Sequence, residues 1–199
     1  KEEGSIKHTN KNDGVGIWND IDGDFNMYKG NISNNYGGVR NNGTGTFCMF
    51  GGTISGNSTD CGGGVNIDRQ GTFLMYGGLI AGNTANYGGG VYNSNKFNMS
   101  GGTITGNTSN QYGGGVFKAS GNFTMSGGEI SNNTAAIQGG GVSNLNATFT
   151  MSDGTTISGN KAKYGGGVHN RGTFTMSGGT ITNNASTKEG GGVYNTDRF

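Results

Sequence analysis

The sequence predicts an all-β protein, a right-handed parallel β-helix in which three short strands form each coil of about 25 residues. The first observation is that all seven methionines recur at intervals of 22 to 26 residues. The second is that Phe, Ile and Val keep the same register, with Phe two positions before each Met and Ile five or six positions after it. A fixed period of this kind is typical of a solenoid, in which each unit stacks on the previous one.

The columns follow the whole chain. They comprise Met27, Met49, Met75, Met99, Met125, Met151 and Met176; Phe25, Phe47, Phe73, Phe97, Phe123, Phe149 and Phe174; Ile6, Ile32, Ile54, Ile80, Ile104, Ile130, Ile157 and Ile181; and Ile17, Val39, Val65, Val91, Val116, Val142, Val168 and Val193. Glycine-rich chains with only 30% apolar residues are often disordered. Random low-complexity sequence does not place its Met and Phe in adjacent columns, so we expect these columns to form a core.

The unit at residues 164–184, YGGGVHNRGTFTMSGGTITNN, shows the predicted elements in order. Strands are expected at 168–170, 173–176 and 180–182, where apolar and polar residues alternate as they do in a half-buried strand. Glycine and asparagine separate the strands and supply the conformations that corners need. Repetition places equivalent strands side by side in parallel, and crossover chirality favours the right-handed form. About 7.5 coils, spaced about 4.8 Å apart, would give a rod about 36 Å long.

Asparagines form two further columns, which we expect to be ladders of amides bonded between coils. One column stands three residues after the Ile position and contains Asn35, Asn57, Asn83, Asn107, Asn133, Asn160 and Asn184. The other stands two residues after the Val position and contains Asn19, Asn41, Asn93, Asn144, Asn170 and Asn195.

The organisation indicates one elongated domain over residues 1–199. Both ends cut through coils, so we expect a segment of a longer protein that tends to associate end to end. Cys48 and Cys61 lie 13 residues apart, about half a period, and are expected to be free thiols on opposite sides of a coil.

Composition argues against several functions. The 13 basic and 12 acidic residues give a net charge of +1, and no basic stripe suggests nucleic-acid binding. No apolar run approaches about 18 residues, so we expect no membrane insertion of this segment.

The segments at 130–144 (ISNNTAAIQGGGVSN) and 148–160 (TFTMSDGTTISGN) resemble repeats of bacterial and archaeal cell-surface adhesin-like proteins. They are also similar to the polymorphic outer-membrane-protein repeat, although Ile-Ser/Thr-x-Asn stands where that family has Phe-x-x-Asn. The motif GGTI recurs at 51–54, 101–104 and 178–181. The resemblance implies a right-handed β-helix, extracellular at a cell surface, that works as a stalk or adhesin without catalytic residues.

Candidate chemistry is sparse. Asp20, Asp22 and Asp24 are spaced two apart, but no Glu closes a calcium loop, so we expect a solvated acidic turn and no metal. Residues that could serve a lyase-like enzyme are expected on different coils and faces: Asp60, Asp68, Asp153, Lys161, Arg171 and Lys188. The two histidines, His8 and His169, are expected more than six coils apart. We therefore expect no enzyme and no cofactor.

One alternative is an ice-binding protein. Outward T-x-T or T-x-S pairs recur along the Ile strands, at Thr53/Ser55, Thr103/Thr105, Thr156/Ser158 and Thr180/Thr182. Leu79/Ala81 and Glu129/Ser131 interrupt this column, and threonine is also a common strand residue.

The candidate binding site is a strip of exposed aromatic and polar side chains beside the adaptable corners. It combines residues that follow each Val with tyrosines that precede the glycine triplets: Trp18, Arg40, Tyr87, Tyr92, Tyr112, Phe117, Tyr164, His169 and Tyr194, with Tyr36 similarly placed. Such a strip could bind a host or cell-surface glycan or protein. It could equally consist of rings that stack on one another and shield the corners. The predicted function is a non-catalytic adhesin or a structural rod module.

Overall fold

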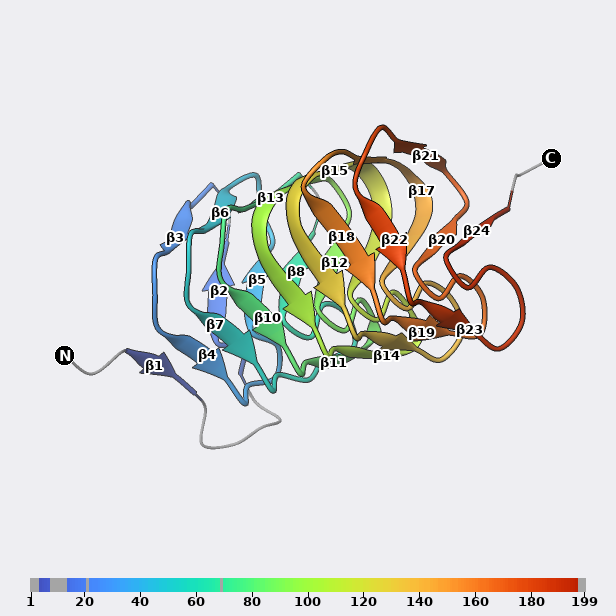
Figure 1. Ribbon diagram of the computed structural model, residues 1–199. Helices are drawn as coiled ribbons and strands as arrows, with labels where there is room; N and C mark the ends of the chain where they lie inside the picture. Colours follow the sequence, from blue (N-terminus) through green and yellow to red (C-terminus); the bar gives the residue numbers. More distant parts are fainter. Residues whose placement is uncertain (1–3, 8–13, 21, 69, 197–199) are drawn as a thin grey trace.

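The computed structural model describes residues 4–7, 14–20, 22–68 and 70–196. This part of the chain contains β-strands and no helix, and all its strand pairs are parallel. The coils stack along one axis in about seven turns, from the N-terminal end to the C-terminal end of the molecule (Figure 1). The predicted parallel β-helix is confirmed.

Three strand columns follow the predicted apolar columns. The Val column contains β2 (Ile17–Asn19), β5 (Val39–Asn41), β8 (Val65–Ile67), β12 (Val91–Asn93), β20 (Val168–Asn170) and β24 (Val193–Asn195). The Phe–Met column contains β3 (Phe25–Met27), β6 (Thr46–Met49), β9 (Thr72–Met75) and β21 (Thr173–Met176). The Ile column contains β1 (Ser5–Ile6), β4 (Asn31–Ser33), β7 (Thr53–Ser55), β10 (Leu79–Ala81), β18 (Thr155–Ser158) and β22 (Thr180–Thr182).

In the middle coils the strands run continuously around corners. These long strands are β13 (Lys96–Thr105), β15 (Val116–Ser131) and β17 (Val142–Met151). They join the three columns into one sheet of nineteen strands that wraps around the core.

The structure adds a fourth short strand that the sequence analysis did not predict. Its column forms a separate five-stranded sheet of β11 (Thr84–Tyr87), β14 (Thr108–Tyr112), β16 (Thr134–Ala135), β19 (Lys161–Ala162) and β23 (Ala185–Ser186). The inward residues of these strands are small, such as Ala85 and Ser109, both 1% exposed. A small inward residue carries little hydrophobic signal, which is why periodicity alone missed this side.

The apolar columns stack in register and form the core. Phe97 pairs with Phe123 and Met99 pairs with Met125 on the neighbouring coil. The rings of Phe97 and Phe123 are nearly parallel, with centroids 4.5 Å apart. All four columns are buried through the middle coils, and each such side chain contributes about 1.5–3 kcal/mol of gross hydrophobic stabilisation.

The corner after each Ile has a fixed backbone conformation. Two residues after Ile, the chain takes a positive φ at Asn34, Asn132 and Asn183, with values of 54° to 59°. Glycine takes the same place in the other coils, as at Gly106, where φ is 62°. Left-handed backbone is accessible mainly to Gly and Asn, so the repeat permits only these residues there.

The first asparagine column is a continuous buried ladder, as predicted. The Asn83 Nδ2 and backbone N–H groups donate to Asn107 Oδ1, both at 3.0 Å. The same Nδ2 group donates to the carbonyl oxygen of Ile54 on the coil before, also at 3.0 Å. Because this pattern repeats from Asn57 to Asn160, each coil is bonded to both neighbours through side-chain amides.

The second asparagine column is interrupted. Asn19 donates to Asn41 at 3.1 Å and Asn144 donates to Asn170 at 2.6 Å. Between these segments, Ile67 and Lys118 occupy the inward position.

Lys118 is fully buried in this column. Its Nζ donates to Asn93 Oδ1 and to the carbonyl oxygen of Asn95. The next member, Asn144, pairs in register with Lys118, and its buried Oδ1 has no partner among the described residues. Burial lowers the pKa of the Lys118 amine from 10.5 to about 7.

Phe123→Ala should destabilise the protein by about 3–5 kcal/mol, because it removes a ring from the middle of a fully packed ladder. Chemical denaturation monitored by circular dichroism measures the free energy of unfolding. Phe174→Ala is the matched control: Phe174 lies in the last coil and is only partly buried, so its loss should be smaller. Equal effects of the two substitutions would contradict the packed-ladder description.

Lys118 should make the stability depend on pH between about 7 and 10.5. In this range the unfolded chain holds a proton that the folded chain lacks, so the free energy of unfolding should rise with pH. Lys118→Asn should abolish this rise and stabilise the protein at neutral pH, since an amide can donate to Asn144 Oδ1. Thermal melts from pH 6 to 10 measure the effect. Lys161→Asn, at an exposed position, is the control, and a wild-type profile unchanged by Lys118→Asn would refute the assignment.

Candidate functional site

The predicted strip residues do form one face. The outward residues of the Val column pair in register from coil to coil, in the order Trp18, Arg40, Asn66, Tyr92, Phe117, Ser143, His169 and Tyr194. Beside them runs a corner column, in which Cys61 pairs with Tyr87, and Tyr112, Gln138 and Tyr164 pair in succession. We call the two columns together the trough.

The middle of the trough is filled. Phe117 is 6% exposed, and its ring lies 5.7 Å from Tyr87, 5.6 Å from Tyr92 and 6.2 Å from Tyr112 between centroids. His169 is only 2% exposed. The expectation that the whole strip is exposed is therefore wrong for Phe117 and His169, because neighbouring rings of the strip pack against them.

Hollows lie on either side of this aromatic cluster in the described part of the chain. The Arg40 hollow has a volume of about 240 Å³ and is lined by Tyr36, Arg40, Thr59, Asp60, Cys61, Asn66, Asp68 and Tyr92. The His169 hollow has a volume of about 360 Å³ and is lined by Gln138, Tyr164, His169, Arg171, Tyr194 and Thr196.

The Arg40 hollow exists because two positions carry smaller residues than their equivalents. Cys61 stands where the next coil has Tyr87. Asn66 stands in the column that holds Phe117 two coils later. The rings that fill the middle of the trough are thus missing here.

Charged groups organise the Arg40 hollow. The Arg40 guanidinium lies 3.1 Å from Asp68 Oδ2, and its Cζ lies 4.8 Å from the centre of the Trp18 ring. Asn86 Nδ2 donates to Asp60 Oδ1 at 3.0 Å. Burial, together with the two carboxylates, raises the pKa of the Cys61 thiol, so the sulfur stays protonated at neutral pH.

The His169 hollow has a neutral base. Burial and the nearby Arg171 lower the pKa of His169 to about 4. Its Nδ1 is buried and has no partner among the described residues. The Tyr194 ring lies 5.4 Å from the imidazole between centroids and covers it.

The enzyme-like residues are less scattered than predicted. Asp60 and Asp68 were expected on different faces, but both line the Arg40 hollow, because the coil brings the corner before Val65 next to the end of β8. His8 lies outside the described residues. Sequence reasoning missed Asn66, Asp60 and Asp68 as site residues, and the available signal was Cys61 at a position that other repeats fill with Tyr.

Metal ligands are not grouped in the described part of the chain: no three His, Cys, Asp or Glu side chains lie together there. In the acidic turn, Asp24 Oδ1 accepts a hydrogen bond from the Thr46 backbone N–H at 2.7 Å, and Asp22 accepts one from the Thr44 hydroxyl. The two thiols, Cys48 and Cys61, are free, as predicted.

Comparison with family models, with curated proteins and with solved structures gave no match. Within the described residues, no helix is long and apolar enough to cross a membrane.

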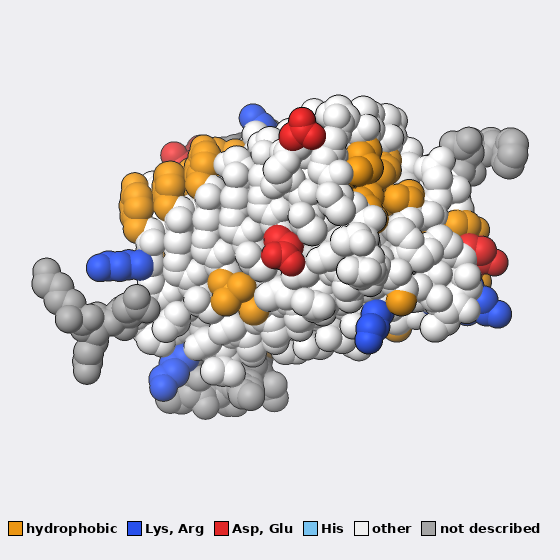
Figure 2. Space-filling view, viewed as in Figure 1, with side chains coloured by type: hydrophobic (Ala, Val, Ile, Leu, Met, Phe, Trp, Pro, Cys, Tyr) orange, Lys and Arg blue, Asp and Glu red, His pale blue; other side chains and the backbone are white. Residues whose placement is uncertain are grey.

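A row of exposed rings on another corner was also missed. Tyr28, Phe50 and Tyr76 directly follow the Met column and are 67%, 42% and 49% exposed. Their rings are nearly parallel, with centroids 4.8 Å and 4.9 Å apart. Figure 2 shows hydrophobic side chains aligned at the N-terminal side of the molecule. Phe50 is stacked between the other two rings, whereas Tyr28 and Tyr76 each have one stacking partner within the described residues.

The threonine-rich Ile face is shown in Figure 2 as a largely uncharged surface with an acidic side chain in its middle. Thr156 and Thr180 are register partners, as are Thr103 and Glu129. Glu129 therefore interrupts the row of outward threonines in the folded structure as well as in the sequence. Ice binding stays a prediction, which thermal hysteresis measurements would check.

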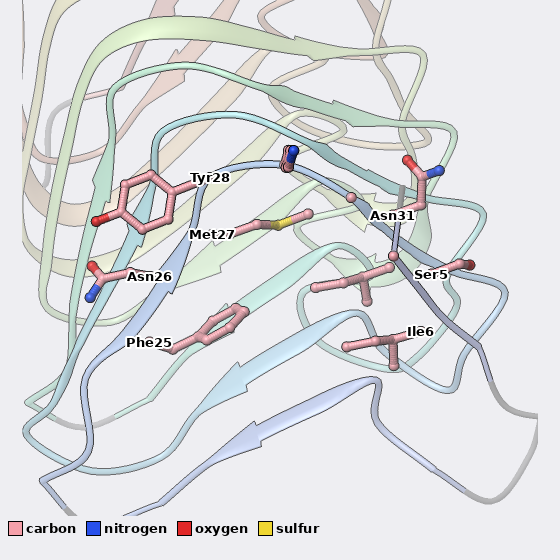
Figure 3. Close-up of a pocket in the computed structure, with 11 residues that line it drawn as sticks. Ser5, Ile6, Phe25, Asn26, Met27, Tyr28 and Asn31 are labelled. Atoms are coloured by element: carbon pink, nitrogen blue, oxygen red, sulfur yellow. The ribbon is translucent and has the colours of Figure 1, made fainter. Parts of the chain in front are cut away.

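Another hollow, of about 410 Å³, lies at the first described coils. Figure 3 shows Phe25, Met27 and Ile6 pointing into it, whereas Asn26 and Tyr28 point away. The hollow thus lies where the Phe, Met and Ile ladders end among the described residues. It has room for side chains that would continue these ladders.

Proposed function

We propose that this chain is a non-catalytic rod module of an extracellular, cell-surface adhesin-like protein that binds a glycan or protein ligand in the trough. The observation that carries the proposal is the arrangement of the trough, where aromatic and polar side chains line two open hollows. Concave sites with apolar walls and a few oriented polar groups are typical of ligand-binding surfaces.

The stacked core supports the rod role. Register is the same from coil to coil in all apolar columns, as in the pairs Ile80–Ile104 and Val116–Val142. A core that continues by nearest-neighbour contacts holds surface residues at fixed spacing along an axis. Side chains on the outward face can then vary without altering the fold, which suits a display surface.

The polar content of the hollows favours a glycan over an apolar peptide. The Arg40 hollow contains a guanidinium and two carboxylates, and the His169 hollow contains an imidazole and a second guanidinium. Sugar hydroxyls both donate and accept hydrogen bonds, so they suit such mixed groups.

A glycan array probed with the labelled protein tests this proposal. Tyr92→Ala and Tyr164→Ala, which remove one aromatic wall from each hollow, should reduce binding at least about tenfold, since one lost anchor commonly costs more than 1 kcal/mol. Thr103→Ala, on the Ile face, is the control and should bind like the wild type. No binding to glycans or to cell-surface protein extracts would overturn the proposal.

We also propose that the rod associates end to end. In the last coil Met176 and Val193 are 46% and 38% exposed, and the first coils leave the apolar hollow of Figure 3 open. Burying such ends against a second copy continues the ladders. Analytical ultracentrifugation should show mass increasing with protein concentration, and Met176→Lys should suppress the increase. A monomer at millimolar concentration would contradict self-association.

A further inference from the structure

Two residues that line the Arg40 hollow, Asn66 and Arg40, each have one buried polar atom without a partner among the described residues. Asn66 is only 8% exposed, and its Oδ1 has no hydrogen-bond donor among the described residues. The Nε of Arg40 is buried and has no acceptor in the same part of the chain. Buried polar groups are nearly always paired in folded proteins, so these atoms suit a ligand that offers one donor and one acceptor.

The hollow has the size of a small polar ligand. Its volume of about 240 Å³ is below the range of about 300–1,000 Å³ typical of sites for drug-sized molecules. Tyr36, which is 39% exposed, and Tyr92 contribute aromatic surface to its walls. The Tyr92 ring is held against Phe117, with centroids 5.6 Å apart, so this wall is fixed before a ligand arrives.

Charge restricts the ligand further. Arg40 is paired with Asp68 at 3.1 Å, and Asp60 adds a second carboxylate. One guanidinium and two carboxylates leave a net charge of −1, which opposes an anionic ligand. The raised pKa of Cys61 keeps its thiol neutral, so the sulfur adds no further charge.

We infer that the Arg40 hollow binds one uncharged hexose unit of a glycan and discriminates against acidic sugars. One sugar hydroxyl donates to Asn66 Oδ1, and a neighbouring oxygen accepts from Arg40 Nε. The Asp60 and Asp68 carboxylates accept from further hydroxyls, and the apolar face of the pyranose ring lies against a tyrosine wall. This inference rests on the glycan-binding function proposed for the trough.

The chain provides a natural way to close the hollow. Tyr87 is the register partner of Cys61 and packs over Phe117 on the following coils. Cys61→Tyr should therefore introduce a ring that the repeat already tolerates one coil later, and the ring should fill the space. Asn66→Leu is a second variant, which removes the unpartnered oxygen while retaining side-chain volume.

The test is saturation-transfer NMR with the methyl glycosides of glucose, galactose and mannose, and with glucuronic acid and N-acetylneuraminic acid as acidic probes. At least one neutral glycoside should bind the wild type, and both acidic sugars should bind at least tenfold more weakly. Cys61→Tyr and Asn66→Leu should each weaken the neutral sugar at least tenfold while keeping the wild-type melting temperature within a few degrees. Thr103→Ala, on the Ile face and outside the trough, should leave monosaccharide binding unchanged.

Equal binding of acidic sugars, or neutral binding that survives both variants, would overturn the inference. The glycan array separates this result from failure of the broader proposal. If array binding survives Cys61→Tyr but is lost in Tyr164→Ala, the trough is adhesive and the Arg40 hollow is not its sugar site. If the wild type binds no glycan in either experiment, the inference fails.

Discussion

Every coil stacks in the same register as its neighbours, and the buried asparagine ladder enforces this alignment. Each ladder amide donates to the next coil and to a carbonyl of the coil before, as Asn107 does to Asn133 Oδ1 and the Ile80 oxygen, both at 3.0 Å. A coil displaced by one residue would turn the asparagine away from the ladder and leave several buried donors and acceptors unpaired. Each such group costs about 1–3 kcal/mol. Apolar columns tolerate a shift in packing more easily than amides tolerate the loss of a partner.

This division of roles explains where the protein varies. Inward positions repeat Val, Phe, Met and Ile, because each must fit between two copies of itself. Outward positions are free to change, and on the trough they change from Trp18 to Arg40 to Asn66 within three coils. The Arg40 hollow results from two such changes, Cys61 and Asn66, in a surface that aromatic rings otherwise close. The hollow therefore forms where smaller side chains replace the rings that neighbouring coils carry.

The sequence predicted the parts of the fold that periodicity encodes. The Val, Phe, Met and Ile columns, the parallel pairing and the first asparagine ladder follow from residues that recur with one period. The fourth strand was missed because its inward residues, such as Ala85 and Ala135, are too small to give a hydrophobic pattern. Lys118 was missed because the column predicts an asparagine at this inward position, and a lysine is normally expected to face solvent.

The candidate site was predicted only in outline. Periodicity places Tyr87, Tyr92 and Tyr112 on one face, but it does not show that they cover Phe117. Periodicity also does not show that Asp60 and Asp68 line the same hollow as Arg40. Their positions depend on the path of a corner whose length differs between repeats. Exposure and concavity arise from packing between coils, which a single repeat read in isolation does not reveal.

Hydrogen exchange of the side-chain amides, followed by NMR, tests whether the buried asparagine ladder holds the coils in register. Slow exchange is expected for the Nδ2 protons of Asn57, Asn83, Asn107 and Asn133, which are buried and bonded on both sides. The exposed amide of Asn110, which donates to Asn86 Oδ1 at 3.0 Å, should exchange rapidly and serves as the internal reference. If the ladder amides exchange as fast as Asn110, the coils are not held together by a buried amide ladder and the account is wrong.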